Sequence, residues 1–193
     1  LLVRTDAAGN VLDSVELPAG LVAGATSSGF EGVTATGSAA AGDEAVWAVI
    51  QREWADDPAG AVKIARYEVA TGEWTFARYP LDAVASPAAD WVGLSEITLL
   101  PDGHSVAIVE RDNAIAGGAR QKLIYGVDLA DPSVEFKPFG ETLDTVGKTL
   151  LRDALGVLDR NSIAVPDKLE GVAITTDRRV FLATDNDGVD ENY

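Results

Sequence analysis

The chain repeats two kinds of paired apolar segment, and this repetition leaves few folds open. The first kind starts near an acidic residue and leads through a turn to an apolar segment with an acidic end, at 29–53, 93–113 and 168–187. The second kind joins two apolar segments through a short turn, at 2–17, 64–79 and 123–136. Short segments rich in Val, Ile, Tyr and Phe between turns of Gly, Asn, Asp and Pro are typical of β-hairpins. We therefore predict that two kinds of hairpin alternate along the chain. The first kind is called the inner hairpin below, and the second kind the outer hairpin.

Together, one inner and one outer hairpin would form a four-stranded antiparallel sheet. Val33, Ile97 and Val172 occupy equivalent positions, 64 and then 75 residues apart. Repetition of such sheets is typical of a β-propeller, whose closed ring has about 4–8 blades. We therefore predict an all-β propeller fragment with two complete blades and two half blades. Residues 1–193 would form a single domain that is incomplete at both ends.

One stretch, 142–158, leaves two interpretations open. The spacing of its apolar residues fits a short helix between blades, although part of it could equally be a strand: Val146, Leu150, Leu151, Leu155 and Leu158.

Composition excludes several kinds of site and partner. The chain has no Cys and one His, so thiolate zinc sites, disulfides, cysteine nucleophiles and multi-histidine metal sites are impossible. The single His104 lies in the turn 101–105, which fits an exposed hairpin tip better than a catalytic triad. With 31 acidic against 15 basic residues and a net charge of −16, nucleic acid would be repelled. No apolar run reaches the roughly 18–20 residues of a membrane span, so no membrane insertion is expected.

The acidic ends of the inner hairpins carry the candidate site. Antiparallel pairing places the start of one strand beside the end of the next, and the innermost strands of a propeller surround its axis. We therefore expect these ends to meet at one mouth of the central channel of the propeller. That mouth would carry many carboxylates, about three basic side chains and few aromatic residues. The acids at these ends are Glu31 and Glu53 in the first inner hairpin, Glu96, Glu110 and Asp112 in the second, and Glu170, Asp185 and Asp187 in the third.

Hard oxygen ligands without imidazole or thiolate favour Ca²⁺ or Mg²⁺. Arg52 and Arg111 end equivalent strands, and they could either neutralise the carboxylates or hold a phosphate group. Alternatively, the acids are only solvated loop residues. The position of Glu96 is a further difficulty, because it lies one residue after the position of Glu31 and Glu170 and would face away unless a β-bulge intervenes.

Several of these segments resemble the phytase-like family, the group described as having esterase-like activity of phytase. The matching segments extend over 29–187: Phe30-Glu31-Gly32-Val33, Leu99–Gly103, Val109-Glu110-Arg111-Asp112, Tyr125–Leu129, Lys168–Ala173 and Ala183–Asp187. The resemblance implies a secreted or periplasmic propeller-like domain whose repeated acids serve phosphoester hydrolysis with calcium. Carried over residue by residue, it implies as metal ligands Glu31, Glu96, Glu110, Asp112, Glu170, Asp185 and Asp187.

Our leading hypothesis is a divalent-metal-dependent phosphoric-ester hydrolase acting on a small phosphorylated substrate. Glu170, Glu31 and Asp185 would be catalytic, and Arg52, Arg111 and Lys168 would bind the substrate. The second hypothesis is a non-catalytic propeller that binds a ligand or protein, since one fold serves many functions. A third is a metal-dependent lactonase-type propeller, which would share the acidic metal ligands and differ in substrate.

Overall fold

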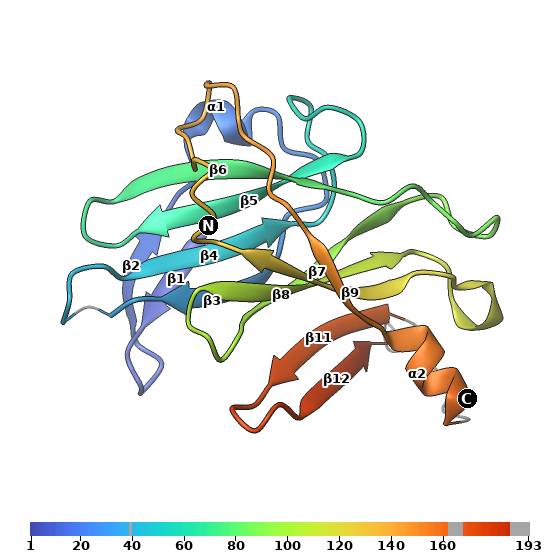
Figure 1. Cartoon of the computed structure of the whole chain (residues 1–193). Coiled ribbons are helices and arrows are strands. Elements are labelled where there is room, and N and C mark those ends of the chain that lie inside the picture. Colours follow the sequence, from blue (N-terminus) through green and yellow to red (C-terminus); the bar gives the residue numbers. More distant parts are fainter. Residues whose placement is uncertain (39, 162–167, 186–193) are drawn as a thin grey trace.

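The computed structural model describes residues 1–38, 40–161 and 168–185, and it is mostly β-structure (Figure 1). Two four-stranded antiparallel sheets form the predicted complete blades. The first blade contains, from the inside outward, β3 (Phe30–Thr36), β4 (Ala45–Ile50), β5 (Ala61–Glu68) and β6 (Glu73–Pro80). The second contains β7 (Val92–Leu99), β8 (Ser105–Asp112), β9 (Lys122–Asp128) and β10 (Thr149–Asp153).

Two further hairpins flank these blades, as the repetition predicts. One pairs β1 (Leu2–Thr5) with β2 (Val11–Val15), and the other pairs β11 (Lys168–Ile174) with β12 (Val180–Asp185). The innermost strands are neighbours, since β3 contacts β7 and β7 contacts β11. The predicted all-β fragment with two complete blades and two half blades is therefore confirmed, and the described strands do not close into a barrel.

The core is divided into three layers, one at each junction between neighbouring sheets. Strand β8 shows how alternation produces them. Val106 and Ile108 pack in the core between the two blades, whereas Ala107 and Val109 pack in the core against β11. A third core joins the β1–β2 hairpin to the first blade, around Trp74. Strands that are buried on both faces explain the nearly continuous apolar sequences.

The stretch 142–158 contains both structures that its spacing allowed. It forms β10 and then the helix α2 (Ala154–Arg160), so the helix is shorter than the stretch and begins later. The carboxylate of Asp153 caps this helix by accepting a hydrogen bond from the backbone N–H of Gly156 at 3.2 Å. The structure also contains a short helix α1 (Ala19–Val22) and a 3₁₀ turn η1 (Ala116–Gly118). None of the described helices is long and apolar enough to cross a membrane.

One predicted strand is wrong. The segment 134–136 was expected to return beside β9 as the outer strand of the second blade, but β10 occupies that place. Instead, the segment after β9 crosses to the first blade, where Lys137 bridges to Phe76 of β6. Phe136 packs edge-on against Trp47 with ring centroids 5.0 Å apart. The local turn at 130–133 indicates a hairpin, but burial of this aromatic ring between blades determines the path.

Candidate functional site

Each inner strand has a β-bulge at its acidic start. The register shifts between Phe30 and Val33 on β3, between Leu94 and Glu96 on β7, and between Leu169 and Gly171 on β11. A bulge adds an unpaired residue and redirects the side chains that follow it. The bulge in β7 contains Ser95, whose hydroxyl donates to the backbone oxygen of Leu169 at 2.6 Å. The sequence indicates that Glu96 would face away from Glu31 and Glu170 unless a β-bulge intervened, and β7 has such a bulge.

Close packing brings the starts of β3 and β7 together. Gly32 is buried, and a Cβ atom there would lie 2.4 Å from the backbone nitrogen of Ile97 and 2.6 Å from Oε1 of Glu96. Only glycine therefore permits this approach. The same Oε1 atom accepts a hydrogen bond from the backbone N–H of Ile97 at 2.7 Å. Glu31 directly precedes Gly32, so the backbone at Glu31 lies near Glu96.

The carboxylate of Glu170 acts electrostatically on two of the other predicted acids, Glu31 and Glu96. Desolvation raises the pKa of Glu31, and repulsion from the Glu170 carboxylate raises it further, whereas Arg111 and Lys168 lower it. Desolvation also raises the pKa of Glu96, and Glu170 again adds repulsion, although the Ile97 N–H lowers it. The structure therefore brings Glu31, Glu96 and Glu170 together, from three different hairpins.

Cationic side chains lie at the same end of the sheets. Nη2 of Arg111 donates to Oε1 of Glu170 at 2.7 Å, and Arg111 is only 2% exposed. The guanidinium carbon of Arg52 lies 4.9 Å from the ring centroid of Trp91, and that of Arg111 lies 5.4 Å from it. Lys168 starts β11, opposite Asp185 at the end of β12. Asp187 lies outside the described residues.

The structure places Glu110 elsewhere. Side chains alternate along β8, so Glu110 faces the junction between the two blades, whereas Arg111 faces β11. Glu110 is fully buried, and its Oε2 accepts from Nζ of Lys148 at 2.7 Å. The same ammonium group pairs with Asp82 at 2.9 Å. Burial raises the pKa of Glu110, and Lys148 lowers it. Glu110 is thus part of a contact between blades.

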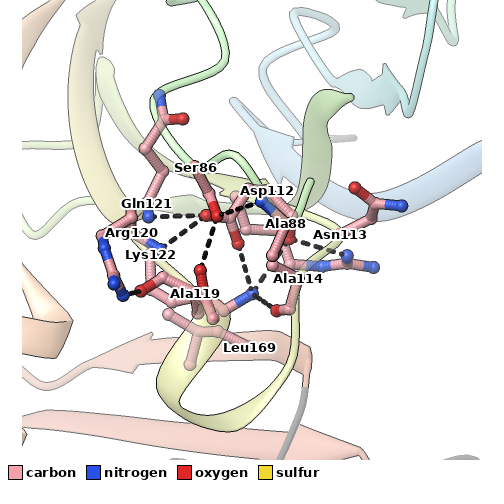
Figure 2. A network of polar contacts seen from close by, with 12 residues as sticks. Ser86, Ala88, Asp112, Asn113, Ala114, Ala119, Arg120, Gln121, Lys122 and Leu169 are labelled. Atoms are coloured by element: carbon pink, nitrogen blue, oxygen red, sulfur yellow. Dashed lines mark hydrogen bonds and ion pairs between the residues drawn. The ribbon is translucent and has the colours of Figure 1, made fainter. Parts of the chain in front are cut away.

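Asp112 is also fully buried within a polar network (Figure 2). Its Oδ2 accepts from the backbone N–H groups of Arg120 at 2.6 Å and Gln121 at 2.9 Å, and its Oδ1 pairs with Nζ of Lys122 at 3.1 Å. These contacts hold the segment after η1 against the end of β8. Glu110 and Asp112 are therefore not among the acids that the structure gathers.

A divalent cation can be tested against this donor set. Within 1–38, 40–161 and 168–185, no group of three or more His, Asp or Glu side chains is arranged to hold a metal ion. The chemistry of Glu31, Glu96 and Glu170 nevertheless fits Ca²⁺ or Mg²⁺, since all three supply carboxylate oxygens. Burial is the main cause of the raised pKa values of Glu31 and Glu96, and repulsion from Glu170 adds to both, whereas Arg111 and Lys168 lower the pKa of Glu31.

The single histidine has an acid and a serine as neighbours, but the three do not have the geometry of a catalytic triad. Nδ1 of His104 lies 3.1 Å from Oδ1 of Asp128 and 3.4 Å from Oγ of Ser105. A catalytic triad needs the acid and the hydroxyl on opposite ring nitrogens, whereas here both approach Nδ1. His104 is exposed at the turn between β7 and β8, as the sequence predicts.

Two residues of this region were not predicted. Trp91 precedes β7 and was missed because aromatic residues were not expected at this mouth. Ser95 occupies the position equivalent to Glu31 and Glu170, and its hydrogen bond to β11 was not predicted. A signal for Trp91 exists in the sequence, since it stands two residues before Gly93, and a glycine inside a strand often marks a close approach.

Comparison with known proteins identifies one family. The model of the family called phytase-like, described as esterase-like activity of phytase, matches residues 1–188. Neither the curated proteins nor the solved structures contain a significant match.

Proposed function

The chain belongs to the phytase-like family, and we propose that it is a phosphoric-ester hydrolase that depends on a divalent cation, calcium or magnesium. One observation carries this proposal: acids from three hairpins lie at one end of the sheets beside two arginines. Glu31, Glu96 and Glu170 supply the negative charge, and Arg52 and Arg111 supply the positive charge. A phosphate ester needs both, because its phosphoryl oxygens attract cations while a carboxylate positions the attacking water.

Each residue then has a distinct task. Glu31, Glu96 and Glu170 would hold the cation, which when bound supplies positive charge that polarises a phosphoryl oxygen. Arg52, Arg111 and Lys168 would bind the remaining phosphoryl oxygens, and Arg111 also fixes the orientation of Glu170. Glu31 would also be the proton acceptor for the attacking water, since a carboxylate at the cation site lies within reach of that water. Asp185, opposite Lys168, would orient that lysine.

Hydrolysis of p-nitrophenyl phosphate with added calcium tests this proposal. We expect turnover that a chelator abolishes, and we expect Glu170→Gln to lower kcat/KM by about 10²-fold or more. Glu73→Gln is the matched control, because Glu73 is exposed at the start of β6, the outermost strand of the first blade, whereas the candidate acids lie on the innermost strands. Turnover that survives both the chelator and Glu170→Gln would contradict the proposal. The absence of turnover in the wild-type chain would favour a propeller that only binds its ligand.

A further inference from the structure

Two arginine side chains share the indole ring of Trp91. Their guanidinium carbons lie 4.9 Å (Arg52) and 5.4 Å (Arg111) from its centroid. The three residues come from different segments: Arg52 follows β4, Trp91 precedes β7, and Arg111 lies in β8. A guanidinium group over an aromatic ring is attracted by the ring and loses rotational freedom. The indole thus holds two positive groups close together.

The backbone is shaped to make this arrangement possible. Gly93 lies directly opposite Arg111 in the β7–β8 ladder. A Cβ atom at Gly93 would lie 2.6 Å from the backbone oxygen of Gln51, 3.2 Å from Cζ3 of Trp91 and 3.3 Å from Cγ of Arg52. The backbone N–H of Leu94 donates to the same Gln51 oxygen at 2.9 Å. Strand β7 therefore lies close to the end of β4, and the missing side chain leaves space for the indole.

Both guanidinium groups retain unused donors. The Nε atoms of Arg52 and Arg111 are buried, and neither has a hydrogen-bond partner in the described part of the chain. Arg111 is paired with Glu170, whereas the side chain of Arg52 makes no ion pair with any described residue. A buried N–H group without a partner is unfavourable, so these donors favour an acceptor that carries negative charge.

We infer that Trp91 is a positioning residue, whose indole fixes Arg52 beside Arg111 so that the two guanidinium groups bind one phosphate-class oxyanion. Arg52 makes the main contact, because it has no competing carboxylate, and Arg111 makes the second contact while it remains bonded to Glu170. This inference rests on the proposed function, since the bound oxyanion corresponds to the phosphoryl group of the substrate. It adds a residue that the acidic repeat does not contain.

Binding of inorganic phosphate, measured by calorimetry at low ionic strength without divalent cations, tests the inference. We expect the wild-type chain to bind phosphate. Trp91→Leu should weaken this binding by about 10-fold or more, because Arg52 is no longer held in place and its hydrogen bonds to the phosphate are lost. Trp91→Phe keeps an aromatic face and should remain within about 3-fold of the wild type. Arg52→Lys keeps the charge but loses the planar fork, and should also weaken binding about 10-fold.

A second arginine–tryptophan pair supplies the control. Arg66 lies 5.6 Å from the ring centroid of Trp47 and pairs with Glu68, away from the bulges. Arg66→Lys should therefore leave phosphate binding unchanged. If Trp91→Leu does not fold, judged by circular dichroism, Trp91→Phe and Arg52→Lys still provide the test.

Two results would overturn the inference: a wild-type chain that does not bind phosphate, or an Arg52→Lys or folded Trp91→Leu variant that binds it as tightly as the wild type. Ester hydrolysis separates this outcome from failure of the proposed function. Phosphate binding that depends on Trp91 without any ester turnover would support the inference and contradict the hydrolase. Ester turnover with an unchanged KM in Trp91→Leu would support the hydrolase and contradict the inference, since loss of a residue that positions the substrate-binding arginine should raise KM.

Discussion

Arg111 and Glu170 form an ion pair between the second blade and the β11–β12 hairpin, with Nη2 and Oε1 2.7 Å apart. The arginine side chain is 2% exposed and that of the glutamate 25%. A buried guanidinium group needs an acceptor, and here the acceptor is an acid of the candidate site. The contact therefore joins the second blade to the β11–β12 hairpin, and in the proposed function it also orients Glu170.

Removal of the charge on Glu170 should lower stability. We expect Glu170→Gln to reduce the free energy of unfolding by about 1–3 kcal/mol, because Arg111 loses a charged acceptor while a neutral one remains. Urea unfolding followed by circular dichroism measures the change. Glu73→Gln should differ from the wild type by less than about 0.5 kcal/mol. Equal stability of the Glu170→Gln variant and the wild type would show that the pair does not stabilise the junction.

Neutralisation of Glu96 should have the opposite effect. Its pKa is raised in the folded chain, so the folded state holds the proton more tightly than the unfolded state. Ionisation therefore destabilises the fold, and this penalty is absent below the unfolded pKa and complete above the folded pKa. Without metal, Glu96→Gln should have a higher Tm than the wild type at pH 7, and the difference should diminish towards pH 4. The glutamine oxygen can still accept the Ile97 N–H bond. The prediction would be contradicted if the Tm of Glu96→Gln exceeded that of the wild type by less at pH 7 than at pH 4.

The close approach at Gly32 should not tolerate a methyl group. Gly32→Ala places Cβ 2.4 Å from the nitrogen of Ile97 and 2.8 Å from Cα of Glu96, so backbone must move. We expect a loss of about 1–3 kcal/mol in the free energy of unfolding, together with weaker calcium binding because the acids separate. Gly29→Ala is the control, because no atom lies within 4 Å of a Cβ there. Similar stability of the two variants would contradict the packing of β3 on β7.

Lys148 should matter for stability rather than for catalysis. Its ammonium group pairs with the fully buried Glu110 and lies 4.2 Å from the ring centroid of Tyr125. Lys148→Met leaves Glu110 as a buried, unpaired acid and should cost about 3–5 kcal/mol. Lys137→Met, which removes the more exposed pair with Asp144, should lower stability much less, because solvent screens such a pair. Thermal unfolding compares the two variants, and equal losses would contradict the buried role of Lys148.

Local sequence patterns account for the hairpins and for three of the acids. Alternation and turn residues are local signals, so β3 with β4, β7 with β8, and β11 with β12 could be predicted. The convergence of Glu31, Glu96 and Glu170 followed from propeller geometry. The bulge that redirects Glu96 could be stated only as a condition, because its cause is packing against Gly32 and Leu169.

Features that depend on contacts between blades could not be predicted in this way. Glu110 and Arg111 are adjacent in sequence, yet they face different junctions, and the repeat alone did not assign Glu110 a partner. The crossing segment that carries Phe136 was taken for a strand because its partner, Trp47, lies in the other blade. The role of Trp91 likewise depends on two arginines from distant segments, although Gly93 indicates a close approach near it.

Calorimetric titration with calcium at low ionic strength tests most directly whether the three glutamates form a cation site. We predict that the wild-type chain binds calcium, that Glu96→Gln and Glu170→Gln each bind it about 10-fold or more weakly, and that Glu73→Gln binds it like the wild type. A wild-type chain that releases or absorbs no heat, or glutamine variants with unchanged affinity, would contradict the account.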